Sequence, residues 1–232
     1  MAKQRSVLSN FRARPLTALA AATVFSVLAP GTALAHHPLG GMPMQTFTDG
    51  LLSGIGHPLL GFDHLFFVII VGVAALYTGR ALLAPAAYIV AMLVGCFLMA
   101  SGVGLPMKEF VIALSLLVVG SVVLSGRALG LTAALVLFAG FGLFHGSAFG
   151  DSIAAQEAGA GMPVLIGYLI GLGVVQYAIA VGAGWIAGTF FKATEAQDIQ
   201  TRLAGAVVAG IGLFLTLENV EGFVLGALGW SA

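Results

Sequence analysis

The five histidines of this chain gather in three short clusters, and aspartates lie beside two of them. The first of these two holds His57, Asp63 and His64 in the stretch HPLLGFDH. The second holds His145 in the stretch FHGSAFGD, which ends at Asp151. Carboxylate and imidazole groups together form a borderline ligand set that suits Ni(II), Co(II) or Zn(II). The sequence therefore predicts a site for a divalent transition-metal ion, and the alternative is that these side chains only form hydrogen bonds between helices.

The composition determines the kind of scaffold that must position these side chains. Of 232 residues, 59% are hydrophobic and only 8% are charged, and the mean hydropathy is +1.07. A soluble domain has about 25% charged residues, so this chain lacks the charges to cover a wetted surface. Its apolar residues must face lipid, with the backbone satisfied in helices. We predict an all-α membrane protein whose partner is the lipid bilayer.

The first 35 residues have the features of a cleaved signal peptide, and an uncleaved first helix is the alternative. A basic stretch precedes an apolar core from Leu16 to Leu28, and Ala33-Leu34-Ala35 forms an A-x-A cleavage site. The apolar core is short for a membrane span. We therefore divide the chain into a signal peptide, residues 1–35, and a transmembrane domain, residues 36–232.

Six apolar segments follow and predict a bundle of six transmembrane helices. The expected spans are Leu59–Tyr77, Leu82–Ser101, Phe110–Leu124, Leu129–Phe149, Val164–Phe191 and Leu203–Leu217. Basic residues concentrate in alternate loops, at Arg80, Arg127, Lys192 and Arg202. The positive-inside rule makes those loops cytoplasmic. A multi-pass protein of the inner membrane follows, with the mature N-terminus and the C-terminus both in the periplasm.

The first motif lies at the outer end of the first span, where we expect a helix to begin near His57 with Pro58 in its first turn. In an unbroken helix, His57 and His64 would lie roughly 10 Å apart along the axis, too far to bind one ion together. Either Gly61 interrupts the helix, or the two histidines are successive stations on a path. Asp63 binds metal itself or orients His64.

The two motifs are predicted to meet at the same depth, because the topology puts both at the outer face. His64 and His145 should then face each other, with coordinating nitrogens roughly 3–4 Å apart if they share a metal ion. We expect Phe144 and Phe149 nearby in a dry lining. Close approach of the fourth span to the first is attributed to glycines spaced by four, namely Gly142, Gly146 and Gly150.

The third cluster, His36-His37, would begin the mature chain after cleavage. A free α-amine beside two imidazoles can capture a metal ion, and a loose terminus without a ligand role is the competing interpretation. No prosthetic cofactor is expected. The zero net charge and the lack of a basic cluster beyond the N-terminal region give no indication of nucleic acid. A nucleotide partner is not expected, because the chain has no phosphate-binding loop.

These residues resemble the motifs of the HupE/UreJ family of nickel/cobalt transporters. The first family motif, H-P-x-x-G-x-D-H-x-x-x-M, matches His57 to His64, with Val68 in place of the methionine. The second, F-H-G-x-A-x-G-x-[EQ], matches from Phe144, with Asp151 or Ser152 near the final acidic or amide position. Phe149 stands where the family often has histidine.

The resemblance extends to the signal peptide and the six spans. It implies metal permeation, with His57, Asp63, His64 and His145 as the functional residues.

We therefore expect a secondary permease or facilitator, and no enzyme, that moves nickel or cobalt as its transported ion from periplasm to cytoplasm. The alternative is a membrane accessory protein that binds metal for hydrogenase or urease assembly without transporting it. An intramembrane hydrolase using His145 and Ser147 is a weaker alternative, because residues two apart point to different sides of a helix. An oligomer is compatible with the sequence.

Overall fold

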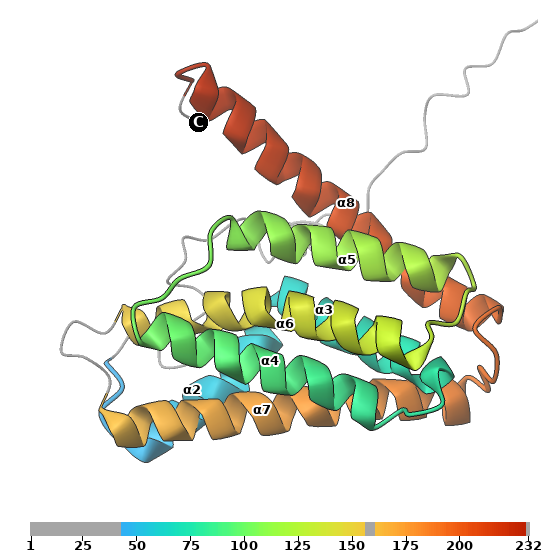
Figure 1. The fold of residues 1–232 in the computed structure, drawn as a ribbon, viewed down its shortest axis with the longest axis horizontal. Helices are drawn as coiled ribbons and strands as arrows, with labels where there is room; N and C mark the ends of the chain where they lie inside the picture. Colours follow the sequence, from blue (N-terminus) through green and yellow to red (C-terminus); the bar gives the residue numbers. More distant parts are fainter. Residues whose placement is uncertain (1–42, 156–160, 231–232) are drawn as a thin grey trace, which may run out of the picture. The chain divides into compact units, whose positions relative to one another are not determined.

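The computed structural model describes residues 43–155 and 161–230, which are helical and contain no strand. The predicted signal peptide lies outside the described residues, as do His36 and His37. The described residues form seven α-helices, which are in chain order α2 (Phe47–Leu60), α3 (Phe62–Ala75), α4 (Leu83–Ala100), α5 (Lys108–Leu124), α6 (Leu131–Ala154), α7 (Met162–Trp185) and α8 (Ile199–Ala227). A short 3₁₀ turn, Leu76–Thr78, extends α3, and a π-helical segment, Ile186–Phe190, extends α7 (Figure 1).

Several of these helices are long and apolar enough to cross a membrane. Four qualify singly, namely α4, α6, α8 and α7 with its π-helical extension. Helices α2 and α3 qualify as one span bent by 81°. Helix α5 has 17 residues, the short end of the range for a span. The prediction of a multi-pass helical membrane protein is confirmed, and the count of six spans stays a prediction.

Helix α2 corrects the expected start of the first span. The helix expected to begin near His57 begins at Phe47, so Pro58 lies in its last turn. The start is set by a capping box, in which the Thr46 hydroxyl accepts from the Asp49 amide and the Asp49 carboxylate accepts from the Thr46 amide. These reciprocal bonds satisfy amide groups that the first turn would otherwise leave without a partner.

The glycines of α6 pack against α4, and the prediction that they face the first span is wrong. A Cβ atom on Gly142 would lie 2.7 Å from the Tyr88 carbonyl oxygen, and one on Gly146 would lie 1.9 Å from that of Met92. Gly150 likewise faces Cys96 and Met99. The residue numbers of the contacting positions increase in the same direction along both helices, so α4 and α6 run parallel and side by side (Figure 1). Because these glycines have no side chain, the backbones of α4 and α6 can approach each other closely.

Helix α3 is the most enclosed element of the bundle. It contacts α2, α4, α5, α6, α7 and α8, and its residues Phe67, Val68 and Val71 are fully buried. Helix α8 differs, because its buried residues all fall between Thr201 and Gly212. Asp63 and His64 thus begin a helix that is surrounded by protein, where a polar side chain meets other protein groups in place of lipid.

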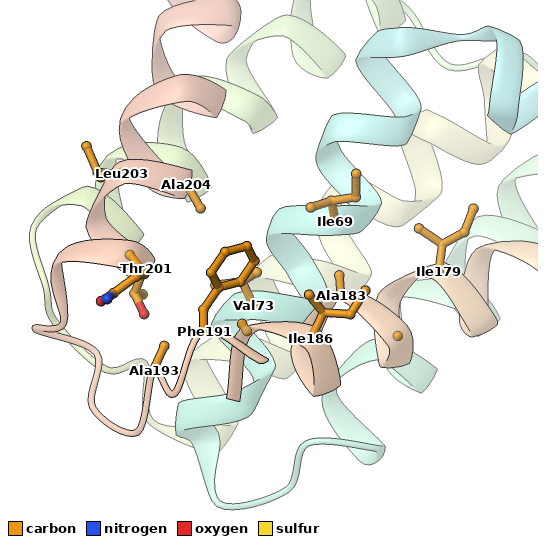
Figure 2. A pocket seen from close by; sticks show the side chains of 13 residues that line it. Ile69, Val73, Ile179, Ala183, Ile186, Phe191, Ala193, Thr201, Leu203 and Ala204 are labelled. Carbon is orange, nitrogen blue, oxygen red and sulfur yellow. The ribbon is translucent and has the colours of Figure 1, made fainter. Parts of the chain in front are cut away.

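An apolar cavity of about 630 Å³ lies between α3, α7 and the first turns of α8. Figure 2 shows Ile69 and Val73 of α3 opposite Ile179 and Ala183 of α7. No histidine lines this cavity. The predicted metal-binding residues therefore belong to a different part of the bundle.

Candidate metal site

The first motif is divided by a break in the helix at Gly61. The Gly61 amide donates to the His57 carbonyl at 3.0 Å and closes α2, and the Leu65 amide donates to the Gly61 carbonyl at 2.9 Å and opens α3. Of the two alternatives for this motif, the interrupted helix is the one observed. The bend brings the ring centroids of His57 and His64 to 6.5 Å.

His64 of α3 and His145 of α6 are in direct contact. Their Nδ1 atoms lie 2.8 Å apart, and their ring centroids lie 4.9 Å apart. His145 is fully buried, and His64 is 7% exposed. The prediction that these two imidazoles face each other is confirmed, at a separation slightly below the expected range.

The hydrogen bonds around His145 determine which nitrogen carries its proton when the ring is neutral. Ser115 of α5 donates its hydroxyl proton to the Ile112 carbonyl at 2.6 Å, and its Oγ lies 2.9 Å from Nε2 of His145. A serine hydroxyl has one hydrogen, so Oγ must accept from Nε2–H. Nδ1 of His145 then carries a lone pair that points at His64.

The position of the proton on His64 follows from its contact with His145. In the neutral pair, Nδ1–H of His64 donates to Nδ1 of His145, which leaves a lone pair on Nε2 of His64. That nitrogen lies 4.0 Å from Oδ2 of Asp63. Two places therefore offer ligand atoms to an ion. One lies between the two Nδ1 atoms, and the other lies between Nε2 of His64 and the Asp63 carboxylate.

Aromatic rings enclose the imidazole pair. Phe67 stacks on His145 with centroids 4.3 Å apart, and Phe149 lies 4.1 Å from His64 and 5.1 Å from His57. The predicted position of Phe149 is confirmed. Among the described residues, Phe144 makes no ring contact with either imidazole. Phe67 was not predicted, although it lies one turn beyond His64 and faces the same way.

His57 is held by side chains of α6 and α7. Its Nδ1 lies 2.8 Å from the Tyr168 hydroxyl and 3.1 Å from the Ser152 hydroxyl. Tyr168 also donates to the Phe149 carbonyl at 3.0 Å. The second motif therefore contacts both histidines of the first, through Ser152 and Phe149 as well as through His145.

The carboxylates near the site fall into two groups. Asp63 lies beside His64, and the Glu109 carboxylate of α5 interacts electrostatically with both residues. Asp151 instead forms an ion pair with Lys108. Glu109 was not predicted from the sequence, because it lies outside both motifs. The predicted ligand Asp151 thus has a cationic partner on α5.

The structure brings the predicted residues together only in part. His64 and His145 touch, and His57 and Asp63 adjoin them. Within residues 43–155 and 161–230, however, no three His, Cys, Asp or Glu side chains are arranged closely enough to hold one ion. The hydroxyl of Ser147 accepts from the Leu105 amide at 3.0 Å, whereas His145 binds Ser115. This arrangement does not pair Ser147 with His145 as nucleophile and base.

Comparison with known proteins agrees with the motifs. The model of the HupE / UreJ protein family matches residues 23–215. "Protein HupE" of Rhizobium leguminosarum bv. viciae is 29% identical over 195 residues, which cover 83% of this chain and 94% of that protein. No solved structure matches the chain significantly. With its motifs joined in one site and most of its length matched, the chain belongs to the HupE/UreJ family, a transporter and accessory family associated with nickel and cobalt uptake for hydrogenase and urease.

Proposed function

We propose that this protein carries a divalent transition-metal ion, nickel or cobalt, from periplasm to cytoplasm. It acts as a six-span permease or facilitator of the inner membrane, with both termini in the periplasm. The ion passes through His57, Asp63, His64 and His145. The observation that carries this proposal is the contact between His64 and His145, whose Nδ1 atoms lie 2.8 Å apart.

That contact supports an ion-binding site between α3 and α6. Two nitrogens bound to one metal at about 2.0–2.1 Å each lie roughly 3 Å apart in a right-angled arrangement, close to the observed separation. An ion that enters between the rings takes the place of the hydrogen on Nδ1 of His64, and that proton moves to Nε2 of the same ring, which faces the Asp63 carboxylate. Ser115 keeps the proton of the neutral His145 ring on Nε2, so the Nδ1 lone pair stays directed at the ion.

Asp63 supplies the negative charge that a divalent ion needs inside a membrane. A carboxylate in a membrane span is costly, and it normally faces a partner or a pathway. Asp63 lies in the first turn of α3, beside His64 and within electrostatic reach of Glu109. Together these carboxylates attract a cation toward the imidazole pair.

A site with few preassembled ligands suits transport better than storage. Conduction requires binding that is favourable enough for entry and weak enough for exit. The described residues offer two touching imidazoles with other groups close by, and no assembled cluster of three ligands. A negative-inside membrane potential would contribute about 4.6 kcal/mol per 100 mV to the inward movement of a divalent ion.

Three predicted ligands are assigned to capture of the ion at the outer face. We place His36 and His37 at the start of the mature chain, where a free amine and two imidazoles would bind an ion before it reaches His57. Asp151 adjoins Ser152, which touches His57. Its carboxylate, now paired with Lys108, would attract cations to the same entrance.

Purified protein in sealed proteoliposomes tests this proposal. We expect saturable uptake of radioactive nickel or cobalt, stimulated by an inside-negative potential. Uptake should be abolished in His64→Ala and His145→Ala variants that insert normally. The alternative, a metal-binding accessory protein for hydrogenase or urease assembly, predicts binding by the detergent-solubilised protein without uptake. Competition among nickel, cobalt and zinc would identify the transported ion.

A further inference from the structure

A second group of polar side chains lies buried between α4 and α7. Tyr88 of α4 donates its hydroxyl proton to Oε1 of Gln176 on α7 at 2.7 Å. The amide Nε2 of Gln176 donates to the sulfur of Met92 on α4 at 3.7 Å. All three side chains are completely buried. We call Tyr88, Met92 and Gln176 the inner cluster.

The inner cluster adjoins His145 and extends from Met92, at the level of His145, to Tyr88 on the side away from His57. The packing of α6 on α4 places Gly142 against Tyr88 and Gly146 against Met92, so Tyr88 is about one helical turn past His145. The His57 end of α6 is the opposite one, because Tyr168 binds both His57 and the Phe149 carbonyl. The Tyr88 and His145 rings are 5.9 Å apart between centroids. An ion leaving the imidazole pair in this direction next meets the inner cluster.

The chemistry of the inner cluster suits a passing metal ion. Its heteroatoms are a phenol oxygen, an amide oxygen and a thioether sulfur, which are neutral ligands of both hard and soft character. Neutral ligands bind a divalent ion more weakly than carboxylate does, and weak successive sites favour release. Polar side chains in a membrane span usually bind each other or line a pathway.

We infer that the inner cluster is a second ion-binding station and the gate that follows the imidazole pair. This inference rests on the proposed transport function. In the described arrangement the gate is closed, because Oε1 of Gln176 is occupied by the Tyr88 proton and the Met92 sulfur by the Gln176 amide. An ion that enters the station displaces the Tyr88 hydroxyl from Oε1 and then leaves as that hydrogen bond re-forms.

Two substitutions of Gln176 test the station, one that should strengthen ion binding at the inner cluster and one that should remove it. Gln176→Glu keeps the shape and replaces a neutral oxygen ligand by a carboxylate. We expect nickel to be retained as a second ion per chain after gel filtration, while uptake falls about tenfold because the ion is trapped. Gln176→Leu removes both polar atoms. We expect it to bind nickel at the imidazole pair as the wild type does and to lose uptake.

Matched substitutions separate the station from an ordinary interhelical hydrogen bond. Met92→Leu is paired with Met99→Leu, and Tyr88→Phe with Tyr77→Phe, whose hydroxyl binds Thr201 and the Ala193 carbonyl elsewhere. We expect only the inner-cluster member of each pair to change the uptake rate. If Gln176→Leu does not fold, the decision rests on Gln176→Glu and Met92→Leu.

The outcomes distinguish failure of the inference from failure of the proposed function. Wild-type protein that binds nickel without uptake would overturn transport, and binding of a second ion by Gln176→Glu would still support the station. Wild-type uptake that is unchanged in Met92→Leu and Gln176→Glu, with no additional nickel bound, would overturn the station and leave transport intact.

Discussion

The ring of Phe149 lies against the imidazole of His64, with centroids 4.1 Å apart and an angle of 35° between the planes. The same ring meets His57 edge-on, with centroids 5.1 Å apart and an angle of 86°. His57 and His64 are themselves 6.5 Å apart between centroids. One apolar side chain therefore contacts both imidazoles of the first motif and limits how they can share an ion.

Replacing Phe149 by histidine should strengthen metal binding. The Phe149→His variant would offer the ion a further nitrogen ligand beside His57 and His64. We expect about tenfold tighter nickel binding by isothermal titration calorimetry, which corresponds to about 1.4 kcal/mol of binding free energy. The control is Phe149→Leu, which stays apolar and should gain nothing. Equal affinities in the two variants would show that position 149 does not face the bound ion.

Removing the hydroxyl of Ser115 should weaken binding without removing a ligand. Ser115→Ala deprives Nε2–H of His145 of its acceptor, so the ring loses the contact that fixes its proton and orientation. Such outer partners are typically worth about 10-fold to 100-fold in metal affinity. Ser121→Ala, an exposed serine on the same helix, should bind nickel like the wild type. Indistinguishable nickel affinities for Ser115→Ala and Ser121→Ala would refute the assigned role.

Neutralising Asp63 should abolish uptake while the protein stays inserted and abundant. The Asp63→Asn side chain keeps its size and loses the charge that attracts a divalent ion beside His64. Asp151→Asn breaks the ion pair with Lys108 and should reduce uptake only at low metal concentration. Both variants are measured in proteoliposomes at matched protein content. Near-normal uptake by Asp63→Asn would remove this residue from the pathway.

A methyl group on Gly146 should destabilise the bundle. The added Cβ would lie 1.9 Å from the Met92 carbonyl oxygen, so α4 and α6 must separate. We expect Gly146→Ala to lose roughly 1–3 kcal/mol, the usual cost of overpacking, seen as a lower Tm in detergent. Gly140→Ala is the matched control, because nothing lies within 4 Å of its Cβ. A wild-type Tm for Gly146→Ala would contradict the observed packing.

The mature chain is predicted to begin at His36. N-terminal sequencing of the membrane-inserted protein should find His36-His37 as its first residues, because Ala33-Leu34-Ala35 forms the expected cleavage site. A chain that retains Met1 or Ala2 would overturn cleavage, and the predicted periplasmic position of the N-terminus would lose that support.

The pairing of the two motifs was predictable because helix length and alternating loop charge limit the depth of each residue. That reasoning placed His64 opposite His145, and the structure confirms it. It also identified Gly61 as a place where the helix could break. Depth along a helix is thus readable from sequence, since each residue advances it by about 1.5 Å.

The rotation of each helix and the identity of its neighbours were not predictable in the same way. The spacing of Gly142 and Gly146 correctly indicated close helix packing, but the predicted partner, the first span, was wrong, because these glycines pack against α4. The contributions of Ser115 and Tyr168 come from other helices, and isolated polar residues carry no motif. Helix α2 was missed because its segment contains Thr48, Asp49 and Ser53, which weaken the apolar signal before His57.

The break at Gly61 makes the first motif a joint with one imidazole on each arm. A continuous helix would fix the separation of His57 and His64, because its geometry allows no independent movement of residues two turns apart. Across a bend of 81°, any change in the angle between α2 and α3 becomes a change in the distance between the two rings. In the proposed site, the affinity for an ion would therefore depend on the backbone conformation of Gly61.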